Sequence, residues 1–366
     1  KGIRMSSGAG AAGVQAGVPT GGVTRAGEAE GGRPSKRNRS MGSEPEISPV
    51  GSLVGHKGSV TALSIDASQE AAGPHQLVSG SEDGSARLWD LERRRAVRCF
   101  LAPSSDAPPE EVTSVASGSG DLQHLIAVSR GSTVAVYDAR EPLVVSRAGV
   151  WQQSLHLDEI SELTMVDGGG WLAAGDDAGE VLVYDLRARK LLRRIEGCHS
   201  NICAAVRFRP GHKWELISGG LDSRVVHSNF NRIRTLHSFT LPKPPSNATP
   251  GQIVNPRFVY SLDCDPSGTF AVAGLGDGNV AVLDLQRRAT VLELEATASL
   301  VAAVRVVPSP GALLVLAGGV DRHVLVARVP VPQSNASPLD SLGADLLRGL
   351  ELGGGSEARS VGSGVS

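Results

Sequence analysis

The sequence predicts an all-β protein built from a repeated sheet, and three observations lead to this prediction. Short apolar strands end in similar dipeptides about every 44 to 55 residues, at Asp90, Asp138, Asp185, Asn229, Asp284 and Arg328. Two further short strands precede each of them, and the breaks carry Asp-Gly or similar turn signals. The strands are too short for the 3.6-residue period of a helix. Sheets repeated at this interval favour a ring of blades, a β-propeller.

Three strands are predicted in each of six repeats. Each strand either alternates apolar and polar residues or is a short apolar run. The first three repeats read SVTALSI, QLVSGS and ARLWD; EVTSVAS, LIAVSR and VAVYD; EISELTM, WLAAGD and VLVYD. The last three read NICAAVRF, ELISGG and VVHSN; VYSLDCD, FAVAGL and VAVLD; LVAAVRVV, LVLAGG and VLVAR. Six repeats are therefore readable, and a seventh blade stays open.

The repeats occupy residues 47–329, between two arms of different composition. Residues 1–46 are mostly Gly, Ala, Ser and Arg and include the basic cluster GRPSKRNR at 32–39. Such a segment cannot bury enough apolar surface to offset its ordering entropy, so we expect a disordered arm. Residues 330–366 form a Gly-rich tail with the same expectation. Its stretch GADLLRGLELGGG fits a brief helix, a degenerate strand pair or the remnant of a last repeat.

Composition and charge limit the functions open to the chain. The formal net charge is −2, so binding of nucleic acid through overall charge is not expected. No apolar run reaches the ~18 residues of a membrane span, and no signal-peptide pattern opens the chain. Four cysteines make no disulfide framework in 366 residues, which favours the cytoplasm and/or the nucleus. Because residue 1 is Lys rather than Met, we expect a fragment.

The first repeat carries the most specific motif. It reads SLVGHKGSVTALSID…HQLVSGSEDGSARLWDLE over Ser52–Glu92, with Gly55-His56 at its head and Trp89-Asp90 at its tail. This segment resembles a nearly complete WD repeat. Three other segments, HSNICAAVRFRP, GGLDSRV and PGQIVNP, resemble elements of the family of WD repeat-containing protein fifty-three, in the same order. The pattern of that family ends in one more repeat, which is not visible in this sequence.

The WD-repeat resemblance implies a buried hydrogen-bonded set in each blade. In such repeats a His, a Ser or Thr, an Asp and a Trp satisfy one another, which makes their burial tolerable. The matching residues of the first repeat are His56, Ser79, Asp83 and Trp89. The fourth repeat keeps His199, Ser218 and Asp222 but has Ser228 in the Trp position. We therefore expect the first blade to be the most rigid.

The remaining repeats keep less of this set. The second repeat has Tyr137 and no His, while the fifth and sixth keep Asp277 and Asp321.

Closure of the ring is a separate requirement. In proteins of this type an early strand completes the last blade, because open sheet edges invite aggregation. We therefore expect residues 47–54 to pair with the blade formed by residues 300–329.

Two repeats end in Tyr-Asp-x-Arg, a pattern with a functional meaning in WD-repeat proteins. These segments are Tyr137-Asp138-Ala139-Arg140 and Tyr184-Asp185-Leu186-Arg187. They resemble the box by which many WD-repeat proteins dock onto the adaptor of cullin-RING ubiquitin ligases. Because side chains alternate along a strand, Tyr184 should anchor inside while Asp185 and Arg187 share the outward face. Arginine suits an interface anchor, although an ordinary strand-edge role stays open.

Motifs that would indicate an enzyme are absent from the sequence: there is no P-loop, no H-E-x-x-H and no G-x-S-x-G. GLGDGN (Gly274–Asn279) joins two strands without a helix N-terminus to hold an anion, so we interpret it as a turn. GCHSNIC (Gly197–Cys203) lacks the second pair of ligands that zinc needs. We interpret Asp176 and Asp177 as residues that stabilise a turn between two strands. We expect no metal, no cofactor and no catalytic residue.

The leading hypothesis is a non-catalytic interaction scaffold, more specifically a substrate receptor that brings a client protein to a ubiquitin ligase. It would act as a monomeric propeller within a complex. One alternative is a nuclear scaffold that reads acidic or histone-like peptides. Another is a propeller enzyme, which would need carboxylates or His residues to converge at the central channel. Propellers host unrelated functions, so the finer hypothesis depends on family analogy and one short motif.

Overall fold

The computed structural model describes residues 51–65, 76–103, 109–166, 170–241, 256–321 and 323–330, together with the backbone of 345–351. The chain divides into two compact units, Lys1–Glu46 and Ile47–Ser366, and every described residue belongs to the second. The predicted arm at 1–46, its basic cluster and most of the tail at 330–366 lie outside the described residues.

Six antiparallel sheets form in chain order, and we number them as blades one to six. The inner strands are β1 (Val60–Ile65), β5 (Val112–Ser117), β10 (Ile160–Val166), β14 (Cys203–Phe208), β18 (Val259–Cys264) and β22 (Val301–Ser309). The second strands are β2 (Gln76–Ser81), β6 (Leu125–Arg130), β11 (Trp171–Asp176), β15 (Glu215–Gly220), β19 (Phe270–Leu275) and β23 (Ala312–Gly319). The third strands are β3 (Ala86–Asp90), β7 (Thr133–Asp138), β12 (Val181–Asp185), β16 (Arg224–Asn229), β20 (Asn279–Asp284) and β24 (His323–Pro330). All the strands predicted from the repeats are therefore present.

A fourth, outer strand completes each blade, and the sequence did not indicate its bounds. These strands are β4 (Arg95–Phe100), β9 (Trp151–Gln153), β13 (Lys190–Ile195), β17 (Arg234–Thr240), β21 (Ala289–Glu295) and β25 (Asp345–Glu351). Between β7 and β9 the chain reaches back to blade one, where β8 (Val145–Ser146) pairs in parallel with β4. A short 3-10 helix, η1 (Gly120–Leu122), links β5 and β6.

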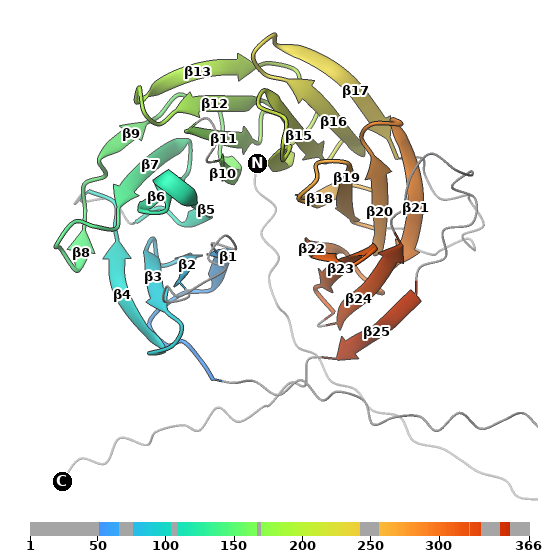
Figure 1. Cartoon of the computed structure of the whole chain (residues 1–366). Coiled ribbons are helices and arrows are strands. Elements are labelled where there is room, and N and C mark those ends of the chain that lie inside the picture. Colours follow the sequence, from blue (N-terminus) through green and yellow to red (C-terminus); the bar gives the residue numbers. More distant parts are fainter. Residues whose placement is uncertain are drawn as a thin grey trace, which may run out of the picture. The chain divides into compact units, whose positions relative to one another are not determined.

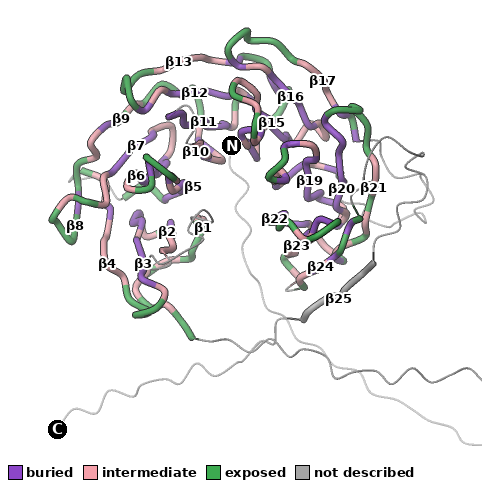
Figure 2. The backbone as a smooth tube through the Cα atoms, viewed as in Figure 1, coloured by how far each residue is buried: buried purple, intermediate pink, exposed green. Residues whose placement is uncertain are grey.

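The six sheets stand around a common centre, with β1, β5, β10, β14, β18 and β22 innermost (Figure 1). This arrangement is the predicted β-propeller. The core lies between blades, where apolar residues of one sheet pack on the inner strand of the next. Figure 2 shows where the buried residues lie along the backbone. Val134 and Val136 of β7, for example, share a buried cluster with Ile160 and Leu163 of β10. The described part of the chain contains no helix with the length and apolar character needed to cross a membrane.

The expectation for ring closure was wrong. The strand beside β24 is β25, so blade six takes its fourth strand from the tail rather than from residues 47–54. The described part of that segment, residues 51–54, forms no strand. The tail segment Asp345–Glu351 accordingly forms one strand instead of a helix or a strand pair. The physical reason is that β24 has only one free edge, and the backbone of Asp345–Glu351 pairs with it from His323 to Arg328, so no edge is left for residues 47–54.

Candidate docking site

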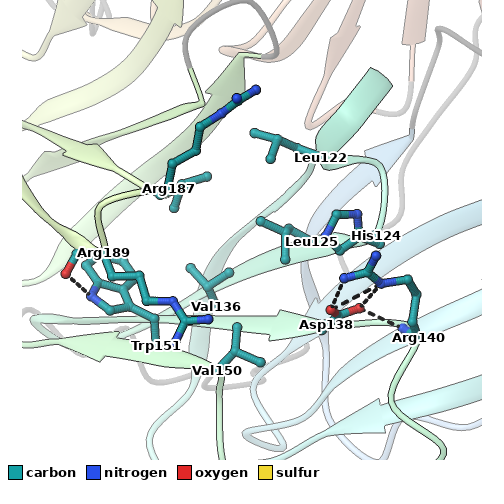
Figure 3. A pocket seen from close by; sticks show the side chains of 11 residues that line it. Leu122, His124, Leu125, Val136, Asp138, Arg140, Val150, Trp151, Arg187 and Arg189 are labelled. Carbon is teal, nitrogen blue, oxygen red and sulfur yellow. Dashed lines mark hydrogen bonds and ion pairs between the residues drawn. The ribbon is translucent and has the colours of Figure 1, made fainter.

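A cleft of about 240 Å³ lies where blades two and three meet, and it brings the two Tyr-Asp-x-Arg segments together. Its apolar part comes from η1, β6, β7 and β9, and the arginines approach from the turns that follow β7 and β12 (Figure 3). The lining residues are Leu122, His124, Leu125, Val136, Asp138, Arg140, Val150, Trp151, Leu186, Arg187 and Arg189. Apolar surface with arginines at its edge is a composition common at protein–protein interfaces.

The two tyrosines of these segments act as anchors in the core. Tyr137 is 2% exposed and Tyr184 is fully buried, as the alternation of side chains predicts. The Tyr137 hydroxyl donates to the Leu101 carbonyl at 3.0 Å, which ties blade two to the end of β4. The Tyr184 hydroxyl has no hydrogen-bond partner among the described residues, and burial raises the pKa of Tyr184 well above its usual value.

Arg140 and Asp138 form a tight ion pair at the edge of the cleft. Arg140 Nε donates to Asp138 Oδ1 at 3.0 Å, and Arg140 Nη2 donates to Asp138 Oδ2 at 2.7 Å. The hydrogen bond from Arg140 lowers the pKa of Asp138, so this carboxylate stays ionised in mild acid. The Arg140 side chain is still 68% exposed. The pair therefore fixes the direction of the guanidinium without burying it.

Arg187 is held much more loosely than Arg140. Its Nη2 lies 3.7 Å from Asp121 Oδ2, and both side chains are mostly exposed. An exposed pair at this distance contributes little to stability, about 0–1 kcal/mol. Asp185 instead accepts a hydrogen bond from the Ala188 backbone N–H at 2.8 Å and stabilises the turn. The two segments thus place one tightly paired and one loosely paired arginine on the same cleft.

In blade one the structure joins all four residues of the expected polar set. Trp89 Nε1 donates to Ser79 Oγ at 2.7 Å, and Ser79 Oγ lies 2.6 Å from His56 Nε2. His56 Nδ1 is 3.3 Å from Asp83 Oδ2, which also accepts from the Lys57 backbone N–H at 2.7 Å. A neutral His56 satisfies this chain, with Nδ1–H donating to Asp83 and Nε2 accepting from Ser79. Burial lowers the pKa of His56, which agrees with the neutral form.

Blade four keeps a shorter version of the same set. His199 Nδ1 lies 3.0 Å from Asp222 Oδ1, and His199 Nε2 lies 2.9 Å from Ser218 Oγ. The Cys198 thiol lies 3.2 Å from Ser218 Oγ, and Ser218 is the equivalent of Ser79, which Trp89 contacts in blade one. Ser228, in the Trp position, has no partner for its hydroxyl among the described residues. Burial opposes a charge on His199, but the hydrogen bonds to Asp222 and Cys198 outweigh it and raise its pKa to about 9.

Blade three contains a polar pair that the sequence did not indicate. His156 Nδ1 lies 2.8 Å from Asp176 Oδ2, and both side chains are fully buried. The interpretation of Asp176 as turn chemistry alone was therefore incomplete, although its Oδ1 does accept from the Glu180 N–H in the turn. Asp176 ends β11 and stands two positions before the place of Asp83, so the repeat spacing could not identify it. The signal available was His156, four residues before β10, as His56 is before β1.

Blades two and five replace the missing histidine with arginine. In blade two the buried Arg130, at the end of β6, donates to the carbonyls of Gly84 and Phe100 of blade one at 3.1 and 3.0 Å. In blade five Arg257 Nε donates to Asp277 Oδ2 at 2.6 Å, with both side chains nearly buried. Neither arginine stands at the repeat's His position, so the repeat pattern does not identify them.

The glycine-rich segment and the cysteines named in the sequence form parts of the blades themselves. GLGDGN spans the end of β19, a turn and the first residue of β20. Cys203 is fully buried in the core between blades three and four, and Cys198 is 5% exposed. Among the described residues, no group of three or more His, Cys, Asp or Glu side chains could hold a metal ion.

Comparison with known proteins agrees with this architecture. The family model described as "WD domain, G-beta repeat" matches residues 47–90. The "WD repeat-containing protein 53 homolog" of Dictyostelium discoideum is 27% identical over 246 residues, covering 64% of this chain and 64% of that protein. The "Guanine nucleotide-binding protein subunit beta" of Zea mays is 27% identical over 135 residues, covering 37% of this chain and 33% of that protein.

The "Pre-rRNA-processing protein crb3/ipi3" of Schizosaccharomyces pombe is 24% identical over 198 residues, covering 44% of this chain and 41% of that protein. The chain thus matches less than two thirds of the length of each of these relatives. The matches confirm the resemblance to WD-repeat proteins and to the group named for protein fifty-three that the sequence motifs predicted.

Proposed function

We propose that this WD-repeat β-propeller is a non-catalytic interaction scaffold and, more specifically, a substrate receptor that docks onto the adaptor of a cullin-RING ubiquitin ligase. The observation that carries the proposal is the convergence of Arg140 and Arg187 on one cleft. The two residues come from different blades, so a partner that enters the cleft can contact both at once. The coarser role as a scaffold agrees with the WD-repeat relatives, which include a G-protein β subunit by name.

The chemistry of the cleft favours a partner with an acidic or carbonyl-rich surface around an apolar contact. Three arginines, Arg140, Arg187 and Arg189, line it, and Asp138 is the one carboxylate among its lining residues. Each guanidinium has five donors in a fixed plane, which suits carboxylates and backbone oxygens. Arg140 uses Nε and Nη2 for Asp138, so Nη1 remains available for a partner. Leu125 and Val136 provide apolar area beneath these charges.

The docking proposal is tested with purified adaptor and the Arg140→Ala/Arg187→Ala double variant. Both side chains are mostly exposed, so the variant should fold normally while its affinity falls at least 100-fold, about 3 kcal/mol. Isothermal titration calorimetry measures this affinity, and thermal unfolding checks the fold. Affinity of the double variant equal to that of the wild type would exclude docking through this cleft.

A matched control uses arginines from the same turn of other blades. Arg93 lies 3.7 Å from Asp90 in blade one, and Arg287 lies 3.3 Å from Asp284 in blade five. The Arg93→Ala/Arg287→Ala variant therefore removes equal charge and similar ion pairs from outside the cleft. We expect less than a threefold loss of affinity. A loss as large as that of the cleft variant would mean that overall charge, rather than the cleft, binds the adaptor.

A second candidate function is supported by negative charge in blades two and three, at the ends of their strands that lie away from the arginine cleft. The segments before β5 and β10 and the turn after β11 carry five acidic residues: Glu110, Glu111, Asp158, Glu159 and Asp177. Burial and the other four carboxylates raise the pKa of Glu159, which shows that these charges lie close together. Such a surface favours a basic, histone-like peptide over an acidic one. Binding of a Lys-rich peptide that Glu159→Gln and Asp177→Asn weaken together would support this role.

We propose a cytoplasmic and/or nuclear location for the chain. The relative named for pre-rRNA processing supports the nuclear part of this proposal, as does the basic cluster at 32–39. A fluorescent fusion of the full chain tests it, with Lys36 and Arg37 changed to Ala. Nuclear signal that the substitution abolishes is the expected result, and exclusion of the wild-type fusion from the nucleus would rule out the nuclear role.

A further inference from the structure

The charges of the propeller are distributed unevenly between its two ends. At one end lie the turns from second to third strands and the loops before the inner strands, and in blades three to five they carry Asp177, Glu180, Glu196, Asp222 and Asp277. Because neighbouring strands are antiparallel, the turns from third to fourth strands lie at the other end, and these are basic. The net charge of −2 therefore combines two ends of opposite sign.

Three consecutive blades supply the basic turns. Residues 185–190 contain three cations and one carboxylate, residues 229–234 contain two cations and no carboxylate, and residues 284–288 contain two cations and one carboxylate. We define the basic face by its exposed cations that lie outside the arginine cleft and have no ion pair among the described residues. They are Lys190, Lys213, Arg232, Arg234 and Arg288.

The carboxylates at this end of blades three to five are engaged by backbone groups. Asp185 accepts from the Ala188 N–H, as described above. Asp284 is 2% exposed and accepts from the Gln286 N–H at 2.9 Å, and Asp265 is 3% exposed. No exposed carboxylate lies in the described turns and loops at this end of the three blades. An anionic ligand therefore meets the cations without competition from exposed acidic side chains.

Contacts between the blades make the basic face continuous. Arg193 Nε, on β13 of blade three, donates to the Asn231 carbonyl in the turn of blade four at 3.5 Å. Arg209 Nε, in the loop after β14, donates to the Gly268 carbonyl of blade five at 2.6 Å. The turns of the three blades thus adjoin one another, and an extended ligand can cross from blade three to blade five.

The backbone of these turns carries a cost that recurs at one position. The fourth residue after the third strand has a φ between 49° and 58° in four blades, at Arg94, Arg189, Ile233 and Arg288. This left-handed region is unfavourable for residues with a β-carbon and is normally occupied by glycine. Three of the four positions nonetheless hold an exposed arginine. A repeated backbone cost at an exposed cation indicates a role for that cation at the surface.

An aromatic ring lies within the basic face. Trp214 is half-buried, whereas the other three tryptophans are at most 9% exposed. The Trp214 carbonyl accepts from the Phe230 N–H at 3.0 Å, which places the ring beside the turn of blade four. Trp171 packs on the ring with the centroids 4.6 Å apart, and Lys213 Nζ lies 5.2 Å from its centroid. A fixed aromatic ring among cations is the combination that holds the bases and phosphates of a single strand.

The composition of the basic face favours a polynucleotide over the other anionic ligands. A membrane surface would require several exposed apolar side chains, but Ile233 is the one large apolar residue exposed among the described residues at this end of blades three to five. An acidic peptide would use the cations and leave the ring without a partner. Arginine also matches the planar geometry of a phosphate group better than lysine does.

We propose that the basic face is a binding site for single-stranded nucleic acid. Arg232, Arg234 and Arg288 contact successive backbone phosphates, and one base stacks against the uncovered part of Trp214. RNA and DNA share this chemistry, so both are tested. The site includes neither Arg140 nor Arg187 and does not depend on the docking proposal.

The experiment uses the full chain and a fluorescein-labelled twelve-nucleotide oligoadenylate, as RNA and as DNA. Fluorescence anisotropy should show saturable binding in the micromolar range. The logarithm of the binding constant should fall with the logarithm of the salt concentration with a slope of about −3, which corresponds to about four phosphates on a single strand. A preference of at least tenfold for one of the two polymers assigns the site to that polymer.

Tryptophan fluorescence reports on the ring directly. Because Trp214 is the half-buried tryptophan of the four, the unlabelled oligonucleotide should quench part of the emission of the wild type. Trp214→Phe keeps an aromatic ring, so it should bind within about fivefold of the wild type but lose this quenching. Trp214→Leu should bind at least fivefold more weakly. Equal quenching in the wild type and Trp214→Phe would contradict the stacking step.

Charge variants test the cations. Arg232→Ala/Arg288→Ala should weaken binding at least tenfold and reduce the salt slope by about 1.4. The charge-matched control is Lys57→Ala/Arg147→Ala, because both residues are exposed and lie outside the basic face; it should lose less than twofold. Arg288→Gly removes the backbone cost together with the cation, so it should raise the melting temperature while it weakens binding.

Four results would overturn the proposal. The first is the absence of saturable binding. The second is binding that Lys36→Ala/Arg37→Ala abolishes and Arg232→Ala/Arg288→Ala leaves unchanged, which would place the contact in the basic cluster at 32–39. The third is equally tight binding of a twelve-residue polyglutamate peptide, which would indicate an acidic protein partner. The fourth is equally tight binding to phosphatidylserine vesicles, which would indicate a membrane surface.

Discussion

Blades one and three share the same four antiparallel strands, to which β8 is added in blade one, but they have different polar interiors. In blade one the Ser79 hydroxyl links Trp89 Nε1 to His56 Nε2, so the polar side chains form one connected chain. In blade three Ala174 stands in the place of Ser79, two residues before the end of its strand. The Tyr184 hydroxyl and His156 Nε2 are both buried without a partner among the described residues.

The difference shows that one hydroxyl decides whether the set is connected. A buried donor or acceptor without a partner costs about 1–3 kcal/mol, while a completed network stabilises and orders the core. Blade one thus gains from its polar residues, and blade three keeps only the His156–Asp176 pair. Each of the following changes should either break the network of blade one or complete that of blade three.

The largest expected effect is that of Asp83→Ala in blade one. Asp83 accepts from His56, from the Lys57 N–H and from Ser85, so its removal leaves several donors unpaired. We expect a loss of about 3 kcal/mol in the free energy of unfolding. Urea denaturation measures it, with Glu92→Ala, an exposed acidic residue of the same blade, as a control that should change by less than about 0.5 kcal/mol. An unchanged unfolding free energy for Asp83→Ala would show that the set does not stabilise blade one.

A pair of substitutions to Phe compares the two aromatic anchors directly. Trp89→Phe removes a satisfied donor and some volume, and we expect a loss of about 2 kcal/mol. Tyr184→Phe removes an unpartnered hydroxyl from the core, so we expect no loss or a gain of up to about 1 kcal/mol. Thermal and urea unfolding of both variants gives the comparison. Equal losses for the two variants would argue against the difference between the blades.

Ala174→Ser should complete the network of blade three. The added hydroxyl is positioned as Ser79 is in blade one, and it can donate to His156 Nε2 and accept from Tyr184. We expect a gain of about 1 kcal/mol. A double-mutant cycle with Tyr184→Phe then measures the coupling of the two hydroxyls, and a coupling of zero would mean that the new hydroxyl does not reach Tyr184.

The last comparison concerns pH dependence, which should differ between blades one and four. The pKa of His199 is raised to about 9, so its stabilising contribution is present below pH 6.5 and is lost as the pH rises through about 9. The pKa of His56 is lowered, so its contribution is lost in the opposite direction, as the pH falls below about 6.5.

Unfolding free energies between pH 5 and pH 10 for the wild type, His56→Gln and His199→Gln test this difference. The alkaline slope should disappear in His199→Gln, and the acid slope should become smaller in His56→Gln. The same slopes in all three proteins would mean that neither histidine changes its pKa on folding.

Much of the fold could be predicted because the second and third strands of blades one to five are buried over most of their length, on both faces. Strands such as Trp171–Asp176 are therefore almost continuous apolar runs, which the sequence shows directly. The outer strands β4 and β13 read RAVRCF and KLLRRI and are mostly half-buried, so charged residues interrupt their apolar pattern. The return of β8 to blade one depends on contacts with β4 that no local pattern encodes.

The candidate site could be predicted only in part, because spacing identifies residues but not their partners. His56 and Asp83 followed from the repeat, whereas Asp176 lies two positions away from the place that the repeat gives to the carboxylate. Arg130 could not be found in this way, since its partners are carbonyl groups of another blade. The Tyr-Asp-x-Arg segments were readable, but their meeting at one cleft depends on the packing of blades two and three.

The measurement that tests the central claim most directly is hydrogen exchange of the full chain with and without purified adaptor. We expect slower exchange in residues 120–125, 138–150 and 186–190, which surround the arginine cleft, and no change in residues 158–160 or 177–180. Protection confined to 158–160 and 177–180, at the other end of the same strands, would contradict it, as would the absence of any protection.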